Sequence, residues 1–289
     1  MKKRVVFLMT ILLMGLVAPN VAAKAKQKTQ INLVTIGDSL TEGVGDTTNQ
    51  GGYEKRTAKL LQQTYHLSVK TTNYGKAGDR SDQILKRIKN NPSAIRVIKK
   101  ADVIVMTAGG NDLQQALFQL MKTKKQTDVL TQLSDNQSDY QKQLTKLTDF
   151  VRETNRHAPL FLFGNYNPLY VYLANRSDLN QAVQLYNGIN QKVITNMKDA
   201  YYVSIYQTLT FGQYQNKKAQ KKLVQEADLA FQGSTKNKVV EKTLSSPEKE
   251  KNQYITEEDH YHPNDKGYDK MSQALVRKML AHKKDWLYQ

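Results

Sequence analysis

The chain has 289 residues, 39% of them hydrophobic, and a formal net charge of +17. This length is sufficient for one large α/β domain or two small ones, and the hydrophobic content supports a packed core. Because the sequence contains no cysteine, disulfides, cysteine nucleophiles and thiolate metal sites are excluded. The basic residues are dispersed, without the aromatic RNA-binding or helix-turn-helix patterns of nucleic-acid binders. We therefore expect no nucleic-acid partner.

Residues 1–23 have the three parts of a secretory signal peptide. Basic residues at positions 2–4 precede an apolar run over 5–17, and small residues then lead to an expected cleavage after Ala23. The apolar run is short for a membrane span, although an uncleaved anchor is the alternative. We expect an exported protein, secreted or associated with the cell envelope. Export without cysteine fits a Gram-positive envelope better than an oxidising periplasm.

After a lysine-rich linker over 24–30, strand and helix patterns alternate through a single domain over 31–289. Strands separated by helices in this order form a parallel sheet, covered on both faces through right-handed crossovers. A polar stretch over 122–138 is expected to be a surface excursion. The apolar and β-branched runs predict strands at 31–36, 67–72, 101–108, from 160 and at 201–206. Apolar residues at helical spacing predict helices at 53–65, around 84–88, at 94–99, after 112, and at 139–156, 179–197 and 266–281.

The stretch from Leu33 to Thr41 combines a strand with a candidate nucleophile. Its apolar run ends in Gly37-Asp38-Ser39, as a buried strand does when it brings a hydroxyl to the carboxyl edge of an open α/β sheet. Ser39 is therefore the candidate nucleophile. By itself such a sequence is most often only a turn, in which Asp and Ser bond to the local backbone. We expect the Gly-rich loop over 42–52 to form one wall of the site.

A serine hydroxyl needs a base, and histidines near the end of the chain supply one. In one candidate pair, Asp259 holds the tautomer of His262 and favours its imidazolium form. Glu257 and His260 have the same i, i+3 spacing, so the spacing leaves both pairs open. His260 and His262 with Asp259 are also a candidate metal site. The sequence offers no evident further His or Cys ligand, however, so we expect no metal.

The oxyanion of an acyl-transfer intermediate needs hydrogen-bond donors. The candidates are the backbone N–H groups of Ser39 and Gly78 and the side-chain amide of Asn111. Glycine at 78 permits a close backbone approach that a side chain would obstruct. Found alone, Asn111 is better explained as a neighbour of a helix N-cap, and Gly78 as a turn glycine.

Four stretches of the chain together resemble the conserved blocks of the GDSL-type SGNH hydrolases. The resemblance extends from about 31 to 281, except for 113–140 and 208–253, and it is greatest to the secreted lysophospholipase-L1-like branch of Gram-positive bacteria. The residues that follow His262 also resemble those after the family histidine, which favours His262 over His260. The four stretches are Gly37-Asp38-Ser39-Leu40, the loop from Asn73 to Gly78, Gly109-Gly110-Asn111-Asp112 and the stretch from Asp259 to Pro263.

The resemblance implies a three-layer α/β/α sandwich with a flavodoxin-like parallel sheet, and no cofactor. It implies a catalytic triad of Ser39, Asp259 and His262. It also implies that Gly78 and Asn111 donate to the oxyanion, beside the N–H of the serine.

The predicted function is an exported serine esterase that hydrolyses carboxylic esters through an acyl-Ser39 intermediate. Its substrate is expected to be a short-chain acyl ester, a lysophospholipid or an O-acetyl ester. The alternative is a basic envelope-associated protein on the same fold, which binds anionic polymers or lipid head groups with little or no catalysis. Phosphoryl transfer is disfavoured, because the sequence has neither a Walker loop nor an acidic metal cluster.

The Gln- and Lys-rich segment 208–253 interrupts the alternation of strands and helices. Connections between such elements normally take a handful of residues, so this one is either a lid or substrate wall, or a surface insertion away from the site. Its apolar residues recur at helical spacing, which predicts an amphipathic helix that covers an acyl pocket or rests on an anionic interface. They include Leu223, Val224, Leu229, Ala230 and Phe231.

Overall fold

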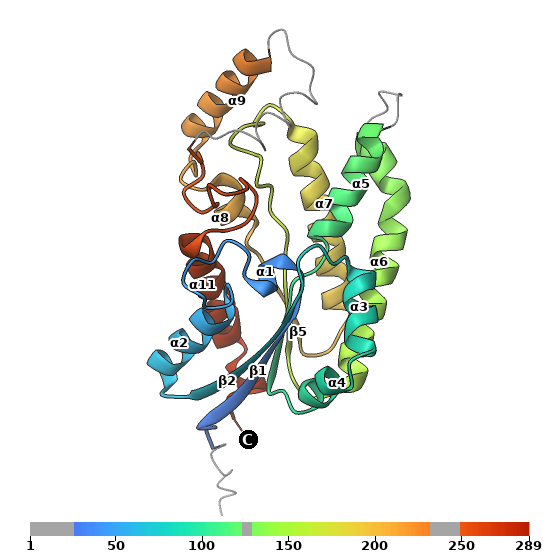
Figure 1. The fold of residues 1–289 in the computed structure, drawn as a ribbon, viewed down its shortest axis with the longest axis vertical. Helices are drawn as coiled ribbons and strands as arrows, with labels where there is room; N and C mark the ends of the chain where they lie inside the picture. Colours follow the sequence, from blue (N-terminus) through green and yellow to red (C-terminus); the bar gives the residue numbers. More distant parts are fainter. Residues whose placement is uncertain (1–25, 123–128, 232–248, 289) are drawn as a thin grey trace, which may run out of the picture.

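A sheet of five parallel strands forms the middle layer of the molecule (Figure 1). The computed structural model describes residues 26–122, 129–231 and 249–288. Helices cover both faces of the sheet, which confirms the predicted α/β/α sandwich. The strands stand in the order β2-β1-β3-β4-β5. Their bounds are Gln30–Gly37 (β1), Ser68–Gly75 (β2), Val103–Met106 (β3), Leu160–Phe163 (β4) and Ala200–Val203 (β5).

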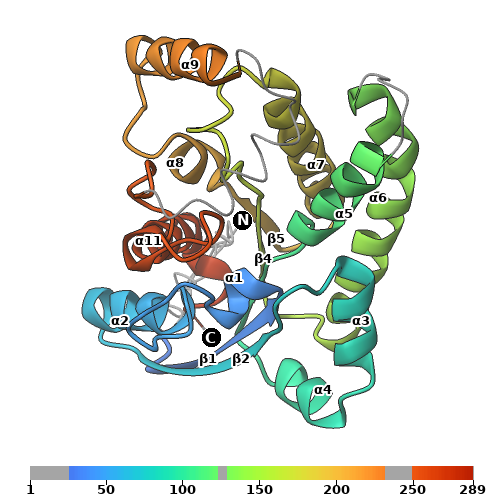
Figure 2. The same ribbon diagram turned by 45° about the horizontal axis from the view of Figure 1, so that its top comes forward.

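The helices divide between the two faces of the sheet (Figure 2). One face is covered by Ser81–Lys89 (α3), Pro92–Lys99 (α4), Gly110–Lys122 (α5), Val129–Thr154 (α6) and Ser177–Thr195 (α7). The other face is covered by Glu54–Tyr65 (α2) and Asp265–Ala281 (α11). The shorter or outlying helices are Ser39–Glu42 (α1), Tyr206–Phe211 (α8), Lys217–Phe231 (α9) and the 3-10 helix Lys283–Asp285 (η1).

The strand order places a topological switch between β1 and β3. From β1 the chain passes through α2 to β2 on one side, and then through α3 and α4 to β3 on the other side of β1. Because these connections cover opposite faces, a crevice is left at the carboxyl ends of the strands, where open α/β folds bind ligands. Ile36 pairs with Met106 near this edge. The residues that follow β1 and the residues that follow β3 therefore begin side by side at the carboxyl edge of the sheet.

Two apolar cores hold the three layers together. Successive side chains of a strand point to opposite faces, and both faces of this sheet are covered, so neighbouring residues must both be apolar. Leu33 and Phe161 pack in the core under α2 and α11, whereas Val34 and Leu162 pack in the core under α3 to α7. The continuous β-branched and aromatic runs of the sequence follow from this double burial.

Several predicted boundaries are wrong; the strand predicted at 201–206, for example, ends at Val203, and Tyr206 begins α8. Helix α6 begins at Val129 rather than at 139, and Leu133 in its first turns is buried in the core. The predicted linker over 24–30 is also too long. Lys28 forms a 2.6 Å ion pair with Asp102, and its N–H donates to a C-terminal backbone carbonyl, so it already belongs to the domain.

The elaborated segment contains the helix that its sequence predicts. This helix is α9, in which Leu223 is buried against Tyr170 and Val171 while Leu229 is 66% exposed. Residues 232–248, and the predicted signal peptide, lie outside the described residues. None of the described helices is long and apolar enough to cross a membrane.

Candidate active site

Ser39 is held at the carboxyl edge of the sheet by the turn that joins β1 to α1. Asp38 caps α1, because one of its carboxylate oxygens accepts from the N–H of Leu40 at 3.1 Å and from the hydroxyl of Thr107 at 2.7 Å. A Cβ at Gly37 would lie 2.7 Å from the carbonyl oxygen of Thr107, so only glycine fits there. Ser39 is thus the first residue of α1 and is 6% exposed. Its N–H is one of those that a helix leaves without an intrahelical partner.

A row of hydrogen-bonded groups links Ser39, His262 and Asp259. Oγ of Ser39 lies 2.8 Å from Nε2 of His262, although the two residues are 223 positions apart. Nδ1 of His262 lies 2.5 Å from Oδ2 of Asp259. The other carboxylate oxygen accepts from the backbone N–H groups of Tyr261 and His262, each at 2.9 Å. A hydroxyl, an imidazole and a carboxylate in this sequence are the parts that a serine nucleophile requires.

The electrostatics of this turn keep Asp259 ionised. Burial acts to raise the pKa of Asp259, but the hydrogen bonds from the ring and backbone of His262 and from the backbone of Tyr261 outweigh it, so the pKa lies below its ordinary value. The carboxylate is therefore charged at neutral pH, where it can stabilise an imidazolium.

His260 is engaged elsewhere. Its side chain is almost completely buried, and Nδ1 lies 2.6 Å from Oε2 of Glu250 and 3.4 Å from the hydroxyl of Tyr172. The structure therefore brings His262 to the serine, and it directs the two histidines to different carboxylates. Within residues 26–122, 129–231 and 249–288, no group of three His, Cys, Asp or Glu side chains is placed to hold a metal ion.

Two of the predicted oxyanion donors, Asn111 and Gly78, lie on segments that bond to each other. The side-chain amide nitrogen of Asn111, in the first turn of α5, donates to the carbonyl oxygen of Asp79 at 2.9 Å. Gly78 precedes that residue and has φ +79°. A Cβ at Gly78 would meet no atom within 4 Å. The left-handed backbone, and not crowding by the protein, is thus what requires glycine at this position.

Arg87 fixes the same loop to the sheet, and sequence reasoning missed it. Its guanidinium donates to the carboxylate of Asp79 at 2.7 Å and to the carbonyl oxygens of Gly37 and Tyr74 at 3.0 and 3.1 Å. These acceptors lie at the ends of β1 and β2 and in the loop after β2. Because two of them are backbone carbonyls, no side-chain pattern in the sequence identifies them.

The comparisons with known proteins agree with this architecture. The GDSL-like lipase/acylhydrolase family matches residues 35–270 of the chain. An uncharacterized protein of Bacillus subtilis, YpmR, is 28% identical over 256 residues, which are 89% of this chain and 84% of that protein. The spore germination lipase LipC of Bacillus licheniformis is 31% identical over 138 residues, which are 48% of this chain and 65% of LipC.

Solved structures share the fold. A lipase from a goat rumen metagenome, Lip_vut3, superposes with a TM-score of 0.59 at 23% identity, covering 86% of this chain and 97% of the lipase. Axe2 is an acetylxylan esterase from Geobacillus stearothermophilus. A catalytic mutant of it superposes with a TM-score of 0.53 at 16% identity, and the match covers 86% of this chain and 94% of the Axe2 chain. At these identities the likeness establishes the architecture alone.

Proposed function

Because the chain belongs to the GDSL-like lipase/acylhydrolase family, and is therefore a carboxylic ester hydrolase, we propose that it is an exported serine esterase with an acyl intermediate on Ser39. The observation that supports this mechanism most strongly is the contact between Ser39 Oγ and His262 Nε2, at 2.8 Å, with Asp259 behind the imidazole.

In the acylation step, Oγ of Ser39 attacks the carbonyl carbon of the ester while Nε2 of His262 accepts the hydroxyl proton. The carbonyl π electrons move onto the oxygen. When the tetrahedral intermediate collapses, the C–O bond to the alcohol breaks, and the alcohol leaves with the proton from His262. Asp259 stabilises the imidazolium in between. The acyl group stays on Ser39 as an ester.

In the deacylation step, water attacks the acyl carbon and gives a proton to His262. The carboxylic acid then leaves as the bond to Ser39 breaks, and the serine oxygen takes the proton back. In both steps the oxyanion accepts hydrogen bonds from the N–H groups of Ser39 and Gly78 and from the amide of Asn111. An amide nitrogen carries two hydrogens, so one serves the contact with Asp79 and the second serves the oxyanion.

For the substrate we propose an ester of a small or single-chain acyl group. The ester is that of a soluble alcohol, a lysophospholipid or an O-acetylated glycan. The 31% identity with a lipase over 138 residues favours acyl esters of this kind. The test is hydrolysis of p-nitrophenyl esters from acetyl to dodecanoyl, a lysophospholipid and an O-acetylated glycan by the wild type and by Ser39→Ala. We expect the wild type to hydrolyse at least one of these esters, and we expect Ser39→Ala to abolish that hydrolysis. If the hydrolysis rate of Ser39→Ala were within threefold of the wild-type rate, the serine would not be the nucleophile.

For localisation we propose export with cleavage after Ala23. The basic, apolar and small-residue stretches before this point support it. Moreover, Gln27 already pairs with Tyr288 near the C-terminus, so a cut after Ala23 leaves the described fold complete. The test is the N-terminal sequence of the protein recovered from the culture medium and from the cell envelope. A chain that still begins with Met1 would contradict cleavage.

For the envelope we propose that the outer side of α9 contacts anionic lipid head groups or anionic polymers. This helix stands beyond the carboxyl edge of the sheet, at the same end as α1 (Figure 1). Its exposed side chains include Leu229, and in its first turns Lys217, Lys218, Lys221 and Lys222. Replacing the four lysines with glutamine should reduce sedimentation with phosphatidylglycerol vesicles or with wall polymer. Equal sedimentation of the variant would refute the contact.

A further inference from the structure

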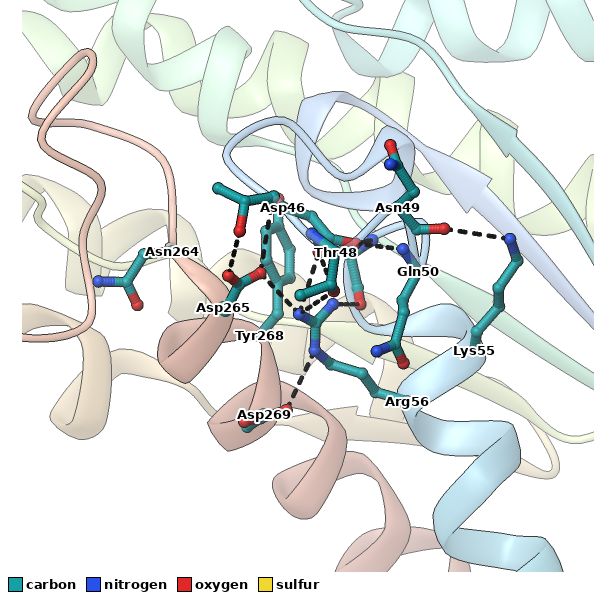
Figure 3. A network of polar contacts seen from close by, with 12 residues as sticks. Asp46, Thr48, Asn49, Gln50, Lys55, Arg56, Asn264, Asp265, Tyr268 and Asp269 are labelled. Carbon is teal, nitrogen blue, oxygen red and sulfur yellow. Dashed lines mark hydrogen bonds and ion pairs between the residues drawn. The ribbon is translucent and has the colours of Figure 1, made fainter.

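Arg56 of α2 binds three carboxylates that come from two separate parts of the chain (Figure 3). Nη2 donates to Asp46 at 3.0 Å and to Asp265 at 2.8 Å, and Nε donates to Asp269 at 3.0 Å. Nη1 donates to the carbonyl oxygen of Gly52 at 2.7 Å. Nη2 also donates to the hydroxyl of Thr48 at 2.9 Å. The Arg56 side chain is only 7% exposed, so this is a buried cation with five acceptors around it.

The carboxylates belong to the two segments that carry the catalytic pair. Asp46 lies in the loop after α1, the helix that begins with Ser39. Asp265 is the first residue of α11 and follows His262 by three positions. The hydroxyl of Thr47 also donates to Asp265, at 2.5 Å. Arg56 therefore sits where the serine segment meets the histidine segment.

Close backbone contacts extend this junction to the histidine itself. A Cβ at Gly45 would lie 2.5 Å from the carbonyl oxygen of Pro263 and 3.5 Å from the Cβ of His262. The hydroxyl of Tyr268 donates to the carbonyl oxygen of Val44 at 2.7 Å. A shift of the loop after α1 relative to α11 must therefore move the imidazole relative to the serine.

The charges make this junction depend on the arginine. The Asp46 side chain is 2% exposed. Burial acts to raise the pKa of Asp46, but hydrogen bonds from Arg56 and Thr48 outweigh it and hold the pKa well below its ordinary value. Without the guanidinium, three carboxylates would face one another and one of them would be buried without a cation, which is strongly unfavourable.

We propose that Arg56 is a positioning residue that sets the distance between Ser39 and His262 by holding together the segments that carry them. This role rests on the proposed function, because its effect is on attack by the serine. Misplacement of reacting groups by about 1 Å can cost about a hundredfold in rate. The contacts of Arg56 in the described part of the chain are with the two segments and not with the serine or the histidine. Its loss should therefore reduce turnover rather than binding of the ester.

The test compares Arg56→Met, Arg56→Lys and Lys28→Met with a soluble acetyl ester. Lys28→Met is the matched control, since it removes another long-range cation, bound to Asp102 at the opposite edge of the sheet. We expect Arg56→Met to lower kcat by about 10- to 100-fold with KM within threefold of the wild type. Arg56→Lys should restore part of kcat, because an ammonium keeps the charge but lacks the planar fork that reaches several acceptors. The control should keep its kcat.

The rate at which a phosphonate labels Ser39 should fall in parallel with kcat. Circular dichroism should show that the variant is folded, and in folded protein a loss of stability alone would not slow the labelling. A folded Arg56→Met protein with wild-type kcat overturns the proposal, and so does an equal loss of kcat in Lys28→Met. If Arg56→Met does not fold, Asp265→Asn weakens the same junction and should lower kcat severalfold; unchanged kcat there overturns the proposal as well. An active Ser39→Ala protein would instead defeat the proposed function.

Discussion

His260 and Glu250 form a buried pair next to the candidate site, with Nδ1 2.6 Å from Oε2. The hydroxyl of Tyr172 donates to the same carboxylate oxygen at 3.0 Å, and the backbone N–H of Asn252 donates to the other at 2.6 Å. The pair joins the end of the elaborated segment to the loop that carries His262. It supports this loop, whereas the neighbouring histidine faces the serine.

The two histidines should therefore respond differently to removal. His262→Ala should lower kcat by about 10⁴- to 10⁶-fold, because it deletes the base of the triad. His260→Ala should leave most of kcat and instead destabilise the fold, by roughly 1–3 kcal/mol, because buried Glu250 loses a hydrogen-bond partner. Ester hydrolysis and urea unfolding of both variants measure this. The reverse ranking of kcat would show that His260 is the base.

Asp259→Asn should reduce kcat by about 10²- to 10⁴-fold, and by less than His262→Ala, because the turn still positions the ring. The pKa of Asp259 lies below its ordinary value. Its contribution to stability is therefore present above about pH 4 and is lost as the pH falls through the lowered pKa. The difference in unfolding free energy between wild type and variant should be larger at pH 7 than at pH 3. A difference that grows on acidification would contradict this sign.

Asn111→Ala should lower kcat by about 10²- to 10³-fold with little change in KM, because the amide is proposed to bind charge that develops only in the transition state. The contact with Asp79 gives the side chain a second role in holding the loop. Steady-state kinetics with an acetyl ester separate the two effects. A rise in KM with unchanged kcat would indicate ground-state binding instead.

Asp38→Asn should be tolerated much better than Asp38→Ala. The N–H of Leu40 and the hydroxyl of Thr107 both bond to Oδ1 of Asp38, and an amide oxygen can accept both. Burial is the largest influence on the pKa of Asp38 and raises it, so a neutral side chain suits the position. We expect Asp38→Ala to lose about 0.5–2 kcal/mol as a missing helix cap does, measured by urea unfolding. Equal losses in the two variants would show that the negative charge is needed.

The elements that rest on continuous patterns were predictable from the sequence. Strand β1 is buried on both faces, so its apolar run continues to Ile36 near the end of the strand, and Ser39 follows two residues after the strand ends at Gly37. The blocks around Gly78, Asn111 and His262 come after later strands or before α11, and parallel strands bring such positions to one edge. The resemblance to a known family added the order of these blocks.

The supporting contacts were not predictable, because their partners are far apart in the sequence. Arg56 reaches Asp269 over 213 positions, and Arg87 reaches the carbonyl oxygen of Gly37 over 50 positions. On their helices both arginines are polar residues with no mark that distinguishes them from solvated ones. The i, i+3 spacing also could not decide between His260 and His262, because the carboxylate that bonds to His260 is that of Glu250, ten positions away.

The acyl intermediate on Ser39 is tested most directly by labelling the protein with a p-nitrophenyl phosphonate and locating the adduct by intact-mass spectrometry and peptide mapping. We predict one adduct per chain, on the peptide that contains Ser39, with ester hydrolysis lost in proportion to labelling and no adduct in Ser39→Ala. Complete inactivation with the adduct on another residue, or a Ser39→Ala protein that still hydrolyses esters, would contradict the mechanism.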